Sequence, residues 1–195
     1  KKMVRNNVMY RTMQSALTTR DDETNEAPVI EGYFAVFDSD YDMGYGMSES
    51  VAPGAFSETL AGDVRALIDH DTRLVLGRTT AHTLELREDS HGLWGKIYIN
   101  PKDSEAMNLY ERVKRGDVSQ CSFGFEILSE ETTFPADGEI HWRITKVKLY
   151  EVSCCTYPAY EETGISARKK DREQIEKRKS EAWKSALLKK LKGEK

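Results

Sequence analysis

The chain has few of the residues that support disulfide, metal or membrane chemistry. Its 195 residues include 3 cysteines, two of them adjacent at Cys154 and Cys155, which gives neither a disulfide framework nor a Cys-x-x-Cys knuckle. The sequence lacks a His-Glu-x-x-His pattern and a phosphate-cradling glycine loop. It also lacks a run of 18 apolar residues and a signal-peptide-like apolar segment. We therefore expect a reduced, intracellular protein that uses no metal and no cofactor.

Charge is unevenly distributed along the chain. Residues 168–195 contain 12 Lys and Arg against 5 Asp and Glu, whereas the rest of the chain has a net charge of −11. This split predicts a folded domain at 28–166 and a basic helical or disordered tail at 167–195, and the polar character of residues 1–27 predicts a flexible N-terminal arm. A basic amphipathic helix binds a membrane, nucleic acid or a partner protein. We expect no membrane contact here, and we favour an acidic protein surface over nucleic acid.

Hydrophobic periodicity predicts several short strands and two helices. Residues alternate between apolar and polar over 29–37, 93–99 and 139–155, as in half-buried strands, and an edge strand is expected near Met9–Met13. An apolar stripe predicts a helix from Ser104, as its cap, to Arg115; a shorter helix is expected over Ala55–Ala61. The stripe consists of Ala106, Leu109, Tyr110 and Val113. Together these elements favour an α+β fold built on a small, mostly antiparallel β-barrel or sandwich.

One predicted strand carries a candidate nucleophile. Over Asp117–Ile127, Cys121 and the apolar residues after it alternate with Ser122 and Gly124. Such a period of two indicates one buried face and one opposite face. Because Gly124 has no side chain, another molecule can approach the strand beside the Ser122 hydroxyl.

A candidate general base follows another short strand. His70 comes directly after an apolar segment and is expected on the same face as Ala66 and Ile68. A strand end is a common place for a functional group to reach a cleft. The other three histidines, at positions 82, 91 and 141, are interpreted as structural or solvated.

Six short sequence motifs occur in one order along the chain. They are Pro53-Gly54-Ala55-Phe56, His70-Asp71, Leu76-Gly77-Arg78, Asp89 with Gly92-Leu93, Ser122-Phe123-Gly124-Phe125, and Glu151-Val152-Ser153 ahead of Pro158-Ala159. Together they resemble the prohead maturation proteases of tailed bacteriophages, and the resemblance covers about residues 30 to 160. This family is thought to share its fold with the herpesvirus capsid-assembly protease, so the resemblance implies a herpesvirus-protease-like barrel.

The resemblance implies a serine endopeptidase with Ser122 as nucleophile and His70 as general base. A serine hydroxyl needs a neighbouring imidazole to take its proton, and a third group fixes the tautomer of that imidazole. The family pattern has an acid where Glu151 stands; His141 and Asp71 are the alternatives. The Leu76–Arg78 segment, read as a turn, is a candidate contributor to the oxyanion hole.

The same resemblance implies where the protein acts and on what. We expect cleavage of the major capsid protein, the scaffold segment and the chain itself inside the assembling prohead, in the host cytoplasm. Self-association is also possible for this family, and the basic tail is expected to target the enzyme to capsid or scaffold. The alternative is a non-catalytic capsid scaffold or assembly chaperone that uses the same domain and tail.

Overall fold

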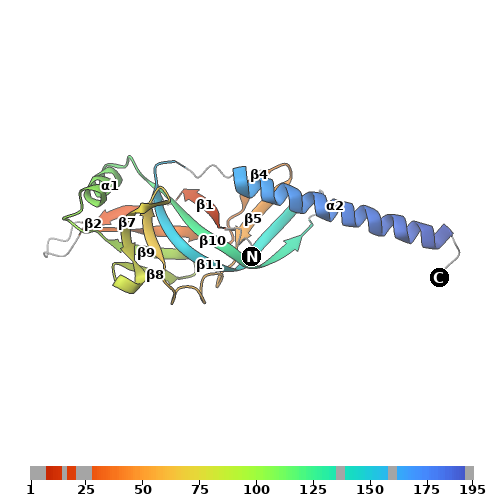
Figure 1. Ribbon diagram of the computed structural model, residues 1–195, viewed down its shortest axis with the longest axis horizontal. Coiled ribbons are helices and arrows are strands. Elements are labelled where there is room, and N and C mark those ends of the chain that lie inside the picture. The colour runs from red at the N-terminus through yellow and green to blue at the C-terminus, as the bar shows by residue number, and fades with distance from the viewer. Residues whose placement is uncertain (1–7, 15–16, 21–27, 135–138, 158–161, 192–195) are drawn as a thin grey trace, which may run out of the picture. The chain divides into compact units, whose positions relative to one another are not determined.

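The computed structural model describes residues 8–14, 17–20, 28–134, 139–157 and 162–191 (Figure 1). The described residues up to 157 form one compact unit, and helix α2 belongs to a second. In chain order the elements are β1 (Met9–Gln14), β2 (Thr18–Arg20), β3 (Val29–Val36), β4 (Tyr41–Gly44), β5 (Met47–Val51), β6 (Arg65–Ile68), β7 (Asp71–Arg78), η1 (Thr79–Ala81), β8 (Leu84–Glu88), β9 (Gly92–Tyr98), α1 (Ser104–Arg115), β10 (Gln120–Thr133), β11 (Ile140–Cys155) and α2 (Glu162–Leu191).

The strands of the described residues form two sheets. One has the order β1-β10-β11-β5-β4, with β6 on a different part of β11 from β5 and β7 beside β6. The other has the order β2-β3-β9-β8. The described residues contain two α-helices as well as these sheets, so the α+β class is confirmed. Both sheets have open edges in the described ranges, so the strands do not close into the expected barrel.

The long strands β10 and β11 position the candidate site. They pair antiparallel from Gln120 opposite Cys155 to Thr133 opposite His141, and they run side by side in Figure 1. In the segment that matters here, Ser122 lies opposite Ser153 and Gly124 opposite Glu151. Directly opposed residues project from the same face of a sheet, so these four side-chain positions share one face.

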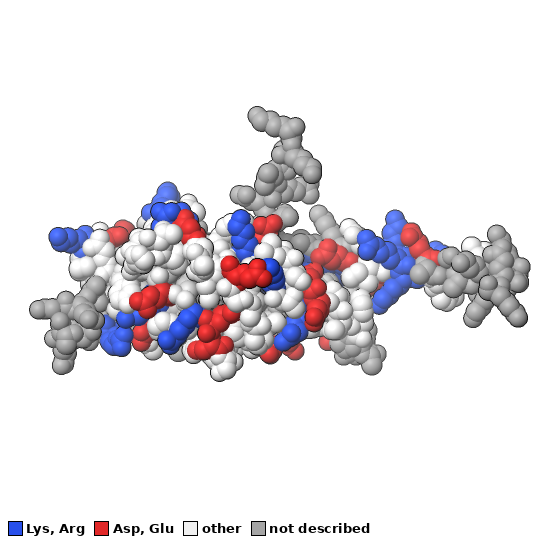
Figure 2. Space-filling model, turned by 90° about the horizontal axis from the view of Figure 1, so that it is seen from below, with Lys and Arg blue, Asp and Glu red and all other residues white. Residues whose placement is uncertain are grey.

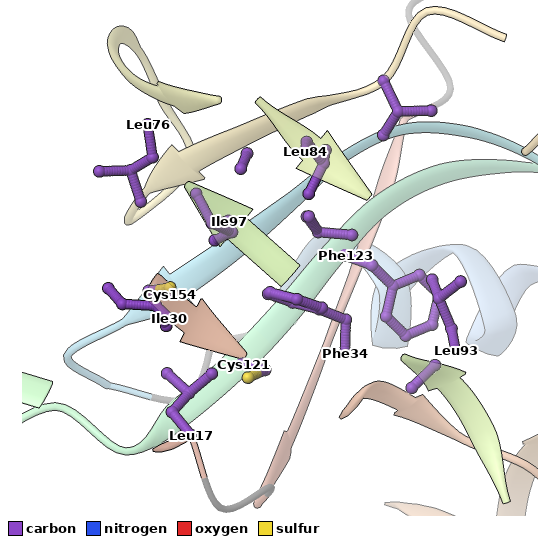
Figure 3. Close-up of a cluster of buried hydrophobic side chains, with 14 of the residues drawn as sticks. Leu17, Ile30, Phe34, Leu76, Leu84, Leu93, Ile97, Cys121, Phe123 and Cys154 are labelled. Carbon is purple, nitrogen blue, oxygen red and sulfur yellow. The ribbon is translucent and has the colours of Figure 1, made fainter. Parts of the chain in front are cut away.

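The other face of β10 and β11 is part of the hydrophobic core. Cys121, Phe123 and Phe125 of β10 are fully buried, as the period-two pattern predicts. They cluster with residues of the second sheet, and Figure 3 shows Phe34, Leu93 and Phe123 within this cluster. Burying aromatic side chains of this size stabilises the fold by about 1.5–3 kcal/mol each. The core therefore fixes which face of β10 carries Ser122.

Two predicted helices have different outcomes. Helix α1 exists, and Ala106, Leu109, Tyr110 and Val113 are its buried residues, as expected. Its N-cap, however, is Asp103 rather than Ser104, because the Asp103 carboxylate accepts the backbone N–H groups of residues 105 and 106. The helix predicted over Ala55–Ala61 is wrong: this segment forms successive turns.

Charged side chains of both signs are mixed on one face of the molecule. Figure 2 shows Lys and Arg interspersed with Asp and Glu over the face that it presents. In the part of the chain that the structure describes, neither helix has the length and apolar character needed to cross a membrane.

Candidate active site

His70 lies in a tight turn between β6 and β7. Ile68 pairs with Asp71, so Asp69 and His70 are the two central residues of a hairpin turn. Both have positive φ values, 47° and 61°, as in a type I′ turn. Residues other than glycine rarely adopt this region, at a cost of about 1–3 kcal/mol each. The surrounding contacts must therefore hold the turn in place.

Those contacts come from the end of β11. The Asp69 carboxylate accepts the backbone N–H of Thr156 at 2.8 Å and faces its hydroxyl at 3.1 Å. The backbone N–H of His70 donates to the Ser153 hydroxyl at 3.3 Å. The hairpin is thus bound to the strand that carries Glu151.

The turn also reverses the expected orientation of His70. Ala66 and Ile68 are part of the hydrophobic cluster, whereas His70 contacts the opposite face of β11. The prediction that all three share a face is wrong, because the period-two pattern ends at Ile68, where the tight turn begins.

His70 and Glu151 are joined by a hydrogen bond. Nδ1 of His70 lies 2.8 Å from Oε1 of Glu151, and the side chains are 18% and 8% exposed. The second carboxylate oxygen of Glu151 accepts the Ser153 hydroxyl at 2.5 Å. A carboxylate that accepts Nδ1–H leaves Nε2 of the neutral ring as the basic nitrogen. The arrangement therefore orients Nε2 for proton transfer.

Gly124 provides the space that this carboxylate occupies. A Cβ at position 124 would lie 2.4 Å from Oε1 of Glu151 and 2.9 Å from Cε1 of Tyr10. The Tyr10 ring, from β1, contacts the His70 ring with a centroid separation of 4.3 Å. Burial, and then the charge of Glu151, raises the pKa of Tyr10. Gly124 and Tyr10 thus enclose the His70–Glu151 pair.

Ser122 lies on the same face but is completely buried. It is paired with Ser153 on one side and with Thr12 of β1 on the other. Its hydroxyl donates to the backbone carbonyl of Arg11 at 2.9 Å. The expectation of an open approach beside Ser122 is therefore wrong, because strand β1 lies there.

Nε2 of His70 faces Cys155, which sequence reasoning did not single out. The Cys155 Sγ lies 3.7 Å from Nε2. Burial, followed by the nearby acidic groups Asp69 and Glu151, raises the pKa of the Cys155 thiol, so it is neutral at ordinary pH. The same period of two that relates Glu151 to Ser153 also reaches Cys155, and that pattern is the signal that could have identified it.

The alternatives to Glu151 lie in other environments. His141 is bonded through its two ring nitrogens to Ser48 and Ser50 of β5, at 2.8 and 2.9 Å. Asp71 forms an ion pair with Arg73, whose hydrogen bonds lower the pKa of Asp71 to about 2. Of the three acceptors considered, Glu151 is the one bonded to His70.

The suggested oxyanion turn is a strand. Residues 76–78 are the end of β7, and a Cβ at Gly77 would lie 2.5 Å from the Thr83 carbonyl oxygen. Gly77 therefore allows close packing of the backbone against Thr83, and Arg78 forms an ion pair with Asp63. In the described ranges, no group of three or more His, Cys, Asp or Glu is arranged to hold a metal ion.

Comparisons with known proteins agree with the sequence resemblance. The profile of the family described as caudovirus prohead serine protease matches residues 15–178. The prohead protease of Enterobacteria phage HK97 is 33% identical over 148 residues, covering 72% of this chain, which spans 60% of the length of that relative. The solved capsid assembly protease of bacteriophage T4, gp21, aligns over 76% of this chain and 99% of its own, at 10% identity and a TM-score of 0.43. Since the family profile covers most of the sequence, the chain belongs to the caudovirus prohead serine protease family.

Proposed function

We propose that this protein is a serine endopeptidase that cleaves capsid and scaffold proteins, and itself, inside the assembling prohead. The observation that carries the proposal is the 2.8 Å bond between His70 and Glu151, on the face of the sheet that also holds Ser122. Membership of a serine protease family supports the same chemistry. The name of the phage HK97 relative, a prohead protease, supports the prohead as the place of action.

Each of the three residues has a distinct role in this proposal. Nε2 of His70 takes the Ser122 proton as Oγ forms a bond to the substrate carbonyl carbon, and then delivers it to the leaving amine. Glu151 holds the ring through Nδ1 and stabilises the imidazolium that forms. Water then hydrolyses the Ser122 ester and releases the new carboxylate.

The reaction requires a rearrangement from the structure described here. The Ser122 hydroxyl donates to the Arg11 carbonyl, and Nε2 of His70 faces Cys155. For catalysis, the Ser122 hydroxyl must turn toward Nε2, and strand β1 must give way to a substrate. We therefore interpret this chain as a resting form of the enzyme.

Cys155 is the nucleophile that Nε2 of His70 faces in this structure. A thiol beside an imidazole is the arrangement of cysteine proteases. Burial raises the pKa of this thiol, however, and the family is one of serine proteases. Ser122 is therefore favoured. A scaffold without catalysis is the alternative from another functional class, and the absence of any cleavage would favour it.

Substituting the triad residues tests the proposal. Ser122→Ala and His70→Ala should each reduce cleavage of the co-expressed capsid protein by about 10⁴–10⁶-fold. Glu151→Gln should reduce it by about 10⁴-fold, because the amide cannot stabilise the imidazolium. Intact mass of the products measures the loss, with Ser129→Ala and Glu126→Gln as matched controls on β10. Full cleavage by Ser122→Ala would show that the nucleophile is another residue.

Gly124→Ala tests the contact that seats Glu151. The added methyl group would push the Glu151 carboxylate away from His70. The protein should still fold, because the crowded atoms belong to the side chains of Glu151 and Tyr10, which can move. We expect a folded protein with cleavage reduced by about 10²-fold, the cost of misplacing a catalytic group by about 1 Å. Peptide cleavage and thermal unfolding would be measured together. Wild-type activity in a variant of unchanged stability would refute the role given to Gly124.

The basic tail is proposed to deliver the enzyme to capsid or scaffold. This follows from its excess of Lys and Arg over the acidic rest of the chain. Deleting residues 168–195 should abolish incorporation into proheads, measured by the protease content of purified particles, while cleavage activity persists. Full-length Ser122→Ala is the converse control, which should be incorporated without cleaving. Normal incorporation of the shortened chain would exclude this role for the tail.

A further inference from the structure

Strand β1 lies along the Ser122 strand in the way that a substrate would. It is antiparallel to β10 over six residue pairs, from Met9 opposite Phe125 to Gln14 opposite Gln120. The Ser122 hydroxyl contacts the carbonyl oxygen of Arg11 at 2.9 Å. In acyl transfer, the nucleophile attacks the carbonyl carbon of the residue before the cleaved bond. Arg11 is the β1 residue whose carbonyl group the Ser122 hydroxyl contacts.

The side chain of Arg11 is received by a buried acid. Nε and Nη2 of Arg11 lie 2.5 and 3.0 Å from the two carboxylate oxygens of Glu49, on β5. The Arg11 and Glu49 side chains are 5% and 2% exposed. Arg11 also lies 5.7 Å from the centre of the Phe125 ring. Glu49 therefore binds the Arg11 guanidinium in a bidentate ion pair, at a buried position that we call the Glu49 slot.

A cavity adjoins this slot. It has a volume of about 550 Å³, and Arg11, Asp40, Glu49 and Phe123 are among the residues that line it. Two of its lining residues are acidic. The space is large enough to admit the end of a long side chain, and its charge favours a cation.

We propose that Glu49 determines specificity by selecting an Arg or Lys residue immediately before the cleaved bond, and that β1 occupies this position through Arg11 in the resting chain. The inference rests on the proposed function, since it assigns the residue that Ser122 attacks. Glu49 contacts the side chain of that residue on one face of the substrate strand. Ser122 reaches the carbonyl from the other face.

The preference for a basic residue follows from the burial of Glu49. When β1 leaves, this carboxylate loses the guanidinium that it binds in the resting chain. A substrate Arg or Lys restores an ion pair with Glu49. A neutral or acidic residue instead leaves the buried Glu49 carboxylate beside a side chain that cannot form an ion pair with it. The discrimination is therefore built into the slot.

The position of β1 makes the exchange feasible. β1 is at the end of its sheet, with β10 as its neighbour in the strand order. Its residues also precede residue 15, where the match to the family profile begins. Removing an edge strand frees the backbone groups of β10, to which an extended substrate can add as a new strand.

The test is to map cleaved bonds in the phage's own capsid protein, co-expressed with the full-length chain. Product masses identify the residue before each bond. Wild type should cut after Arg or Lys, and exchanging Arg with Lys in the capsid protein should preserve cutting. Changing that residue to Gln should slow cutting by at least about 10²-fold.

Two protease variants complete the experiment. In Arg11→Gln with Glu49→Gln, the buried pair is neutral, so cutting after Gln should equal or exceed cutting after Arg. Glu126→Gln, outside the slot, should keep the wild-type preference. The substrate substitutions use only wild-type protease, so they decide the question even if the double variant fails to fold.

The outcomes separate this inference from the proposed function. Cuts that require Ser122 but follow residues of other kinds would overturn the role of Glu49 and leave the protease assignment standing. A Glu49 double variant that folds and keeps the preference for Arg would also overturn that role. Absence of any Ser122-dependent cut would overturn both.

Discussion

The register between β10 and β11 is the constraint on which the site depends. It places Ser122 opposite Ser153 and Gly124 opposite Glu151, so the proposed nucleophile, the proposed acid and the space for that acid come from two adjacent strands. The aromatic residues on the opposite face hold that register, because a slip by one residue would exchange the buried and polar faces. The polar face is therefore positioned by the core beneath it.

The His70 turn and the β1 strand are two further constraints on this face. The turn has positive φ at both central residues and is bound to β11 through Asp69 and Ser153. Strand β1 contributes the ion pair between Arg11 and Glu49, whose loss of one partner would cost about 3–5 kcal/mol in a buried setting. Under the proposed function, β1 must be displaced before a substrate reaches Ser122. Such a delay would suit an enzyme that enters a shell before it acts.

Features that repeat with a local period could be predicted from the sequence. The alternation around Ser122 predicted β10 and its buried face, and the stripe on residues 104–115 predicted helix α1 with its buried residues. The order of the six short motifs indicated the prohead protease family, and the match to the family profile confirms it. These signals lie within single elements or in the order of the chain, so one sequence is enough to reveal them.

The features that sequence reasoning missed depend on contacts between distant segments. The orientation of His70 follows from a two-residue turn with positive φ values. The alternation of apolar residues that ends at Ile68 does not reveal these φ values. The closure over Ser122 depends on β1, more than 100 positions earlier in the chain. Cys155 comes to face His70 only once β11 and the hairpin are packed together. The N-cap is Asp103 and not Ser104. Asp and Ser are both preferred at this position, so residue type alone could not distinguish these two neighbours.

In the proposed mechanism, the pair of His70 and Glu151 activates Ser122. Covalent labelling of the purified full-length protein with a fluorophosphonate tests this activation, with the modified residue located by peptide mass. We expect a single adduct on Ser122, formed slowly as β1 opens and abolished in His70→Ala. An adduct on another residue instead, or equal labelling of Ser122 in wild type and His70→Ala, would contradict it.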